Sequence, residues 1–202
     1  MKPPRRKPRS QRAERRTVFL VTNGEVTESA YLQKLSRRVD RERVSVNVKV
    51  IKGDPRTVVR QLGGSHSDLS EYREVWVVVD HDGQDRHDFL AACRKLSSKR
   101  TVVHGVVSVP CFEVWLNAHY APVKNYQNQA DAQTHYRELT GLSSKDAKML
   151  PDDFPWGRGA QAAARCYLPT DSLPEADTQG PCPSTTMPHL LRSLGLLSAD
   201  EL

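Results

Sequence analysis

Two carboxylates stand two positions apart at the end of an apolar run, in the segment 75–83 (VWVVVDHDG). The run from Val75 to Val79 is mostly β-branched and predicts a strand buried on both faces, as in a parallel sheet. Residues i and i+2 of an extended chain point to the same side, so Asp80 and Asp82 are expected to face together. Ligands of open α/β sheets bind beyond the carboxyl ends of the strands, and hard cations take oxygen ligands. We therefore expect this pair to bind Mg²⁺ or Mn²⁺, although the same residues also suit a plain Asp-Gly turn.

The elements that would position this pair alternate along the chain. Strands are predicted at 17–22, 44–50, 75–79 and 101–109, and helices are predicted to begin near Thr27, Pro55, Phe89 and Pro110. Residues 44–50 alternate valine with polar residues, which is typical of a half-exposed strand near a sheet edge. The alternation predicts an α/β fold, with a mainly parallel sheet and helices on both faces.

Three glutamates are expected near the aspartate pair. The first and third strands are usually neighbours in this winding, which brings the 23–28 loop, with Glu25 and Glu28, beside Asp80. The fourth strand ends near Glu113, one turn into the next helix. Metal-assisted phosphoryl transfer needs such a cluster, although each glutamate alone also suits a helix start. The candidate catalytic residues are therefore Glu28, Asp80, Asp82, Glu25 and Glu113, and the candidate metal ligands are Asp80, Asp82 and Glu28.

The chain of 202 residues divides into three parts by composition. We expect residues 1–16 to form a basic, disordered tail, 17–120 the α/β core, and 121–202 a mostly helical extension. In the extension, helices are predicted at 128–139, 143–150, 158–168 and 189–197, and a loop at 169–188. We find no apolar stretch near the roughly 18 residues that span a membrane and no signal-peptide core, so a cytoplasmic protein is expected.

The basic charge is concentrated in the tail. The first sixteen residues hold eight Lys and Arg against Glu14, a net +7, whereas the whole chain carries +6; the rest therefore carries 6 − 7 = −1. Such an arm can bind nucleic-acid phosphates without reading the base sequence. A tail that only increases solubility is the alternative.

Four segments together resemble the RloB family, and through it TOPRIM domains and the nucleases of the OLD family. They are 21–28 (VTNGEVTE), 77–82 (VVVDHD), 110–116 (PCFEVWL) with His119 behind it, and 183–191 (PSTTMPHLL). The third segment and the start of the fourth are the most specific. The resemblance implies a TOPRIM-like, Rossmann-like fold and a Mg²⁺-dependent nuclease-type site. It also implies association with an AAA-type ATPase in phage-defence operons.

One position differs from the family pattern and leaves three functions open. The glycine of the first motif usually follows a glutamate, and here it follows Asn23. Glu25 or Glu28 could supply the carboxylate of a nuclease. Alternatively, the chain is a non-catalytic TOPRIM-like module that binds a partner protein or nucleic acid. A third interpretation takes residues 80–83 as the D-x-D-G motif of a phosphatase, although that motif normally ends the first strand of its sheet.

Overall fold

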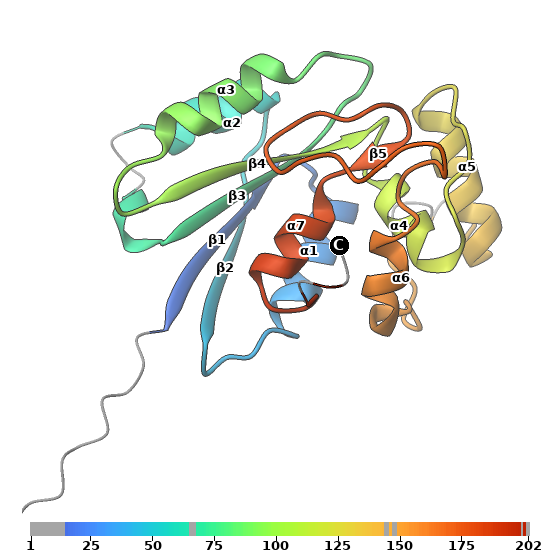
Figure 1. Cartoon of the computed structure of the whole chain (residues 1–202), viewed down its shortest axis with the longest axis horizontal. Helices are drawn as coiled ribbons and strands as arrows, with labels where there is room; N and C mark the ends of the chain where they lie inside the picture. Colours follow the sequence, from blue (N-terminus) through green and yellow to red (C-terminus); the bar gives the residue numbers. More distant parts are fainter. Residues whose placement is uncertain (1–14, 65–67, 144–145, 147–148, 199, 201–202) are drawn as a thin grey trace, which may run out of the picture.

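A five-stranded sheet forms the centre of the computed structural model, which describes residues 15–64, 68–143, 146, 149–198 and 200 (Figure 1). Its strands are β1 (Arg16–Thr22), β2 (Val44–Val50), β3 (Glu74–Asp80), β4 (Val102–Val109) and β5 (Ser184–Thr185). The order is β2-β1-β3-β4-β5, and only the pairing of β5 with β4 is antiparallel. The four predicted strands and the edge position of β2 are confirmed, and so is the expected α/β class.

Helices cover both faces of the sheet, as the alternation predicted. They are α1 (Thr27–Ser36), α2 (Pro55–Leu62), α3 (His87–Leu96), α4 (Glu113–Tyr120), α5 (Gln129–Thr140), α6 (Gly159–Ala163) and α7 (Met187–Ser193), with 3₁₀ turns η1 (Leu69–Glu71) and η2 (Trp156–Arg158). In Figure 1, α2 and α3 lie on one face, and α1 and α7 lie on the other. Within the described ranges, no helix is long and apolar enough to cross a bilayer.

The period-2 geometry of the strands explains the two layers. Val75, Val77 and Val79 of β3 pack with α2 and α3, whereas Trp76 and Val78 pack with α1 and α4. A strand with apolar residues at every position can contribute side chains to the hydrophobic cores on both faces of the sheet. Because both faces are covered, polar chemistry on this sheet is left to the strand ends.

The C-terminal part returns to the sheet. Strand β5 lies inside the predicted loop 169–188, and the hydroxyl groups of Ser108 and Thr185 are hydrogen-bonded at 2.8 Å. Helices α6 and α7 share one buried cluster with α1 and α4. The helix predicted at 143–150 is wrong where the structure describes it: residues 143, 146, 149 and 150 are not helical, and the others lie outside the described residues. The last helix begins at Met187 and ends at Ser193.

Candidate active site

Asp80 is the last residue of β3, and its carboxyl group is buried at the carboxyl end of the sheet. Its Oδ1 atom is fully buried and has no hydrogen-bond partner among the residues that the structure describes. Burial raises the pKa of Asp80 well above its usual range, and the charges of Glu28, Glu113 and Asp82 raise it further, in that order. A buried carboxylate that faces three other acids has a high free-energy cost for the fold, and such groups are typical of functional sites.

Of the two glutamates that follow β1, Glu28 lies near Asp80 and Glu25 pairs with a residue outside the cluster. Glu25 forms an exposed ion pair with Lys52 at 2.9 Å. The Glu28 carboxyl group lies over Gly24, so close that a Cβ built on this glycine would be 2.1 Å from the Glu28 Cδ atom. Glu28 also has the largest Coulombic effect on Asp80. The structure therefore brings Glu28 into the cluster and leaves Glu25 outside it.

In the same loop, the Asn23 side chain bonds to a residue outside the acidic cluster. The Asn23 side-chain amide donates a hydrogen bond to the Gly53 carbonyl at 3.2 Å, which links the loop to the chain beyond β2. The Thr22 hydroxyl accepts the Gly24 N–H at 3.0 Å and holds the turn. Asn23 thus has a structural partner, and the carboxylate nearest Asp80 on this loop belongs to α1 instead.

Helix α4 supplies the third acid. Glu113, its first residue, is only 5% exposed, and its charge raises the pKa of Asp80. The backbone N–H of Phe112 acts in the opposite direction and lowers the pKa of Asp80 in part. Acids are favoured near a helix N-terminus, which explains how Glu113 can be buried here. The predicted proximity of the first, third and fourth strand ends therefore produces a real cluster.

Asp82 joins the cluster by a different geometry from the one expected. The chain is not extended beyond Asp80: Asp82 has a left-handed φ of 50°, and its N–H donates to the Pro110 carbonyl at 3.1 Å. Its side chain is 45% exposed. The period-2 reasoning therefore fails at this point, because a turn replaces the strand, and Asp82 lies at the outer, solvent side of the cluster.

Arg86 is a site residue that the sequence analysis missed. It is buried, its Nε donates to the Asp80 carbonyl at 2.9 Å, and its Nη2 lies 3.9 Å from Asp82. Its own N–H donates to the Gln179 side chain at 2.8 Å. Arg86 holds the 80–86 turn through the backbone. Nothing in the local spacing distinguishes it from a solvated arginine, because its partners come from the turn and from a distant loop.

His119, which the third motif includes, lies elsewhere. It packs against Tyr31, Trp115 and Phe154, and its Nδ1 is 3.3 Å from the Pro155 carbonyl. Burial lowers the pKa of His119 to about 4. The imidazole is therefore neutral at physiological pH, and its contacts are those of a core residue.

The donor set fits a hard divalent cation that keeps part of its water shell. Among the described residues, no three His, Cys, Asp or Glu side chains are close enough to enclose a metal ion. Mg²⁺, however, is usually held by one or two carboxylates and several waters. The unpartnered Oδ1 of Asp80 is suited to direct binding, with Glu28 beside it and with Asp82 at the open side. The cluster suits Mg²⁺ or Mn²⁺ better than a soft metal that needs a closed cage.

Gly24→Ala is expected to weaken Mn²⁺ binding about 10–100-fold, the usual effect of disturbing a group that orients a ligand. The new methyl group would overlap the Glu28 carboxyl group, which must therefore move, and it can do so because it is the far end of a flexible side chain. Stability should change by less than about 0.5 kcal/mol, as for most surface substitutions. Calorimetric titration measures the affinity. The control is Gly157→Ala, where the structure leaves open space; equal losses in both variants would contradict this arrangement of Glu28.

Comparison with known protein families identifies a relationship for most of the chain. A family model described as "RloB-like protein" matches residues 18–194, which includes all five candidate acids. No curated protein and no solved structure matches the chain.

Proposed function

Because the chain belongs to the RloB-like protein family, we propose that its acidic cluster is the active site of a metal-dependent nuclease. The observation that supports this most strongly is Asp80: a buried carboxylate with a raised pKa, an unpartnered oxygen and three acidic neighbours. These acids come from the ends of β1, β3 and β4, the place where open α/β sheets bind their ligands.

Each residue has a role that its position suggests. Asp80 and Asp82 would hold Mg²⁺ or Mn²⁺, together with Glu28. A bound cation would supply charge neutralisation for the phosphate and a more acidic water. Glu28, the flexible acid beside Asp80, would accept the proton of the attacking water. Glu113 would keep the cluster negative, and Arg86 would position Asp80 through its backbone.

The proposed ATPase partner and the proposed role in phage defence come from the family resemblance. We propose that the nuclease works with an AAA-type ATPase in defence against phage. The basic tail would add non-specific affinity for nucleic acid; apart from Arg15 and Arg16, it lies outside the described residues. Arg16 itself begins β1 and pairs with Glu74 at 3.0 Å.

The test is a cleavage assay with the full chain, with and without an AAA-type ATPase of the kind that the family resemblance implies. Single- and double-stranded DNA and RNA are incubated with Mg²⁺, Mn²⁺ or EDTA. Cleavage should require the cation and should be lost in Asp80→Ala, because the buried oxygen ligand is removed. The matched control is Asp85→Ala, in the same turn but exposed and paired with His87.

Two results would contradict the proposal. Equal cleavage by Asp80→Ala and the wild type would place the activity elsewhere or in a contaminant. No cleavage by the wild type of any substrate, with the ATPase and the cation present, would favour the non-catalytic binding module.

A further inference from the structure

A row of arginines crosses the opposite end of the sheet. Each parallel strand has an arginine at or just before its first residue: Arg15 and Arg16 at β1, Arg43 at β2, Arg73 at β3 and Arg100 before β4. Strand pairing sets their order as Arg43, Arg15 and Arg16, Arg73, Arg100. Neighbouring strands are about 4.8 Å apart, so the row is an extended line of positive charge.

Backbone hydrogen bonds fix this row. The N–H of Arg73 donates to the Thr17 carbonyl at 2.9 Å, and the Arg73 carbonyl accepts from Val102 at 3.0 Å. The N–H of Arg16 donates to the Arg43 carbonyl at 2.9 Å. The positions of the charges are therefore set by the folded sheet, and ordering them for a ligand costs only side-chain entropy.

Several of these cations form no ion pair within the part of the chain that the structure describes. Arg16 pairs with Glu74, and Arg43 has an exposed pair with Asp40. No carboxylate of the described residues forms an ion pair with Arg15, Arg73 or Arg100. Unpaired arginines side by side repel one another, and a negatively charged ligand would remove that repulsion.

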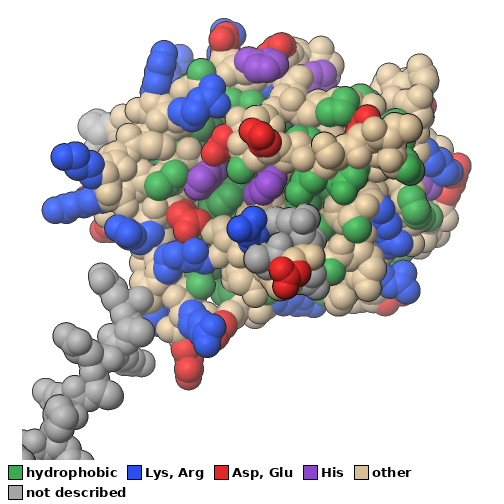
Figure 2. Space-filling view, in the orientation of Figure 1, with side chains coloured by type: hydrophobic (Ala, Val, Ile, Leu, Met, Phe, Trp, Pro, Cys, Tyr) green, Lys and Arg blue, Asp and Glu red, His purple; other side chains and the backbone are tan. Residues whose placement is uncertain are grey.

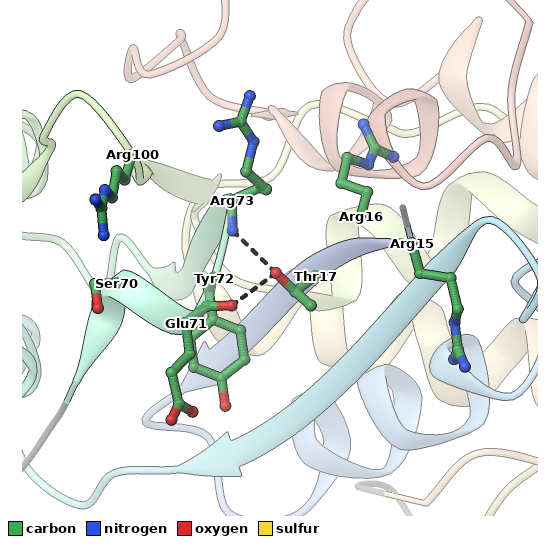
Figure 3. Close-up of a pocket in the computed structure, with 8 residues that line it drawn as sticks. All are labelled: Arg15, Arg16, Thr17, Ser70, Glu71, Tyr72, Arg73 and Arg100. Carbon is green, nitrogen blue, oxygen red and sulfur yellow. Dashed lines mark hydrogen bonds between the residues drawn. The ribbon is translucent and has the colours of Figure 1, made fainter. Parts of the chain in front are cut away.

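The surface around them is hollowed. A depression of about 630 Å³ is lined by Arg15, Arg16, Thr17, Ser70, Glu71, Tyr72, Arg73 and Arg100, with Glu71 as the one acid in that lining. Figure 2 shows Lys and Arg side chains gathered along the edge of the molecule where the strands of Figure 1 begin. In the close-up of Figure 3, the guanidinium groups spread outward from the strand ends and do not converge on one point. This spread suits an extended polyanion better than a single phosphate ion.

We infer that the members of this row that form no ion pair among the described residues, Arg15, Arg73 and Arg100, bind the phosphodiester backbone of a nucleic acid. The three arginines extend over two strand spacings, about 10 Å, which matches roughly three phosphates at 3.4 Å per nucleotide of one strand. Arginine suits this role because its planar fork matches phosphate oxygens.

The row is a second contact, separate from the acidic cluster. Seven residues of β3 separate the two sheet ends, about 23 Å at 3.3 Å per residue. A strand with stacked bases, which rises about 3.4 Å per nucleotide, needs about seven nucleotides to reach both ends. Binding at the row needs no metal, so it can be measured independently of the proposed nuclease activity.

The test compares the full chain with the triple variant Arg15→Gln, Arg73→Gln, Arg100→Gln, with EDTA present. Fluorescence anisotropy with a labelled single strand, of DNA and then of RNA, gives the affinity as a function of salt. Loss of three phosphate contacts should make the slope of log K against log salt shallower by about two units. At about 0.1 M salt the affinity should fall by roughly 10²-fold.

The control triple variant removes the same charge elsewhere: Arg56→Gln, Lys124→Gln and Arg137→Gln, on α2, the 121–128 segment and α5. The control should bind like the wild type. Equal losses in both variants, or no loss in the row variant, would overturn the inference, and so would binding of phosphatidylserine vesicles but not of oligonucleotides.

A second measurement needs no variant. Phenylglyoxal modifies exposed arginines, and saturating oligonucleotide should protect Arg73 and Arg100 of the wild type in peptide mass spectra. Unchanged modification of both residues would equally overturn the inference.

Discussion

Glu28→Gln is expected to lower the rate of metal-dependent phosphodiester cleavage by about 10²–10⁴-fold, the usual contribution of a general base. The amide keeps the shape of the side chain but cannot accept the proton of water, and it binds a cation more weakly. Glu28 is the acid with the largest Coulombic effect on Asp80, and it leans over Gly24 toward the cluster. Initial rates at fixed Mg²⁺, on the substrate that the wild type cleaves best, give the ratio.

The matched control is Glu25→Gln, three residues earlier in the same loop. Glu25 is 55% exposed and pairs with Lys52 rather than with the cluster. Its rate should stay within roughly twofold of the wild type, as expected for a surface change of about 0.5 kcal/mol or less. Normal activity in Glu28→Gln, with a loss in Glu25→Gln, would show that the wrong glutamate has been assigned to the site.

The fold could be predicted because its determinants are local. Runs such as 17–22 and 75–79 are apolar at nearly every position, which only a strand covered on both faces needs. The alternation of valine with polar residues in 44–50 placed β2 at the edge. Strand β5 could not be predicted, because a strand of two residues is too short to show an alternating pattern. It is held against β4 in part by the hydrogen bond between the hydroxyl groups of Ser108 and Thr185.

The acidic cluster was only partly predictable. The order of the strands follows from the usual winding, so the gathering of acids at one sheet end could be expected. The sequence could not predict which glutamate joins the cluster, because Glu25 and Glu28 lie close together in the chain. Glu25 is held outside by its ion pair with Lys52, and the lack of a side chain at Gly24 leaves room for the Glu28 carboxyl group. The role of Arg86 depends on a carbonyl partner and a distant glutamine, and neither leaves a sequence signal.

The two ends of the sheet have opposite charge for related reasons. Parallel strands bring together the residues that end each strand, and equally those that begin each strand. Acids at the ends of β1, β3 and β4 therefore form a cluster, and arginines at the starts of β1 to β4 form a row. The arginine row was invisible in the sequence because its members lie about 30 residues apart and need the strand register to line up.

Asp80→Asn is expected to make the metal-free protein more stable at neutral pH, by about 1 kcal/mol or more, because it removes a buried charge that lacks a cation. The raised pKa of Asp80 means that the folded state holds this proton more tightly than the unfolded chain, whose Asp pKa is about 3.9. The protonated Asp80 side chain therefore makes its whole contribution to stability when the pH is below the unfolded pKa of about 3.9. That contribution is lost as the pH rises through the higher pKa of the folded state. Asparagine does not titrate, so the loss of stability with rising pH should be smaller in the variant.

A saturating cation should reverse the order of stability. At a concentration of 100 times its dissociation constant, Mg²⁺ or Mn²⁺ adds about 2.7 kcal/mol to a protein that binds it only when folded. At about 2–4 °C per kcal/mol for a chain of this size, the wild-type Tm should rise by about 5–10 °C, while that of Asp80→Asn should hardly change. Thermal unfolding of both proteins, with EDTA and then with the cation, tests the crossing. If Asp80→Asn is less stable than the wild type in EDTA, the buried Asp80 carboxylate does not destabilise the metal-free protein. If Asp80→Asn gains as much stability from the cation as the wild type does, Asp80 is not a ligand of the metal.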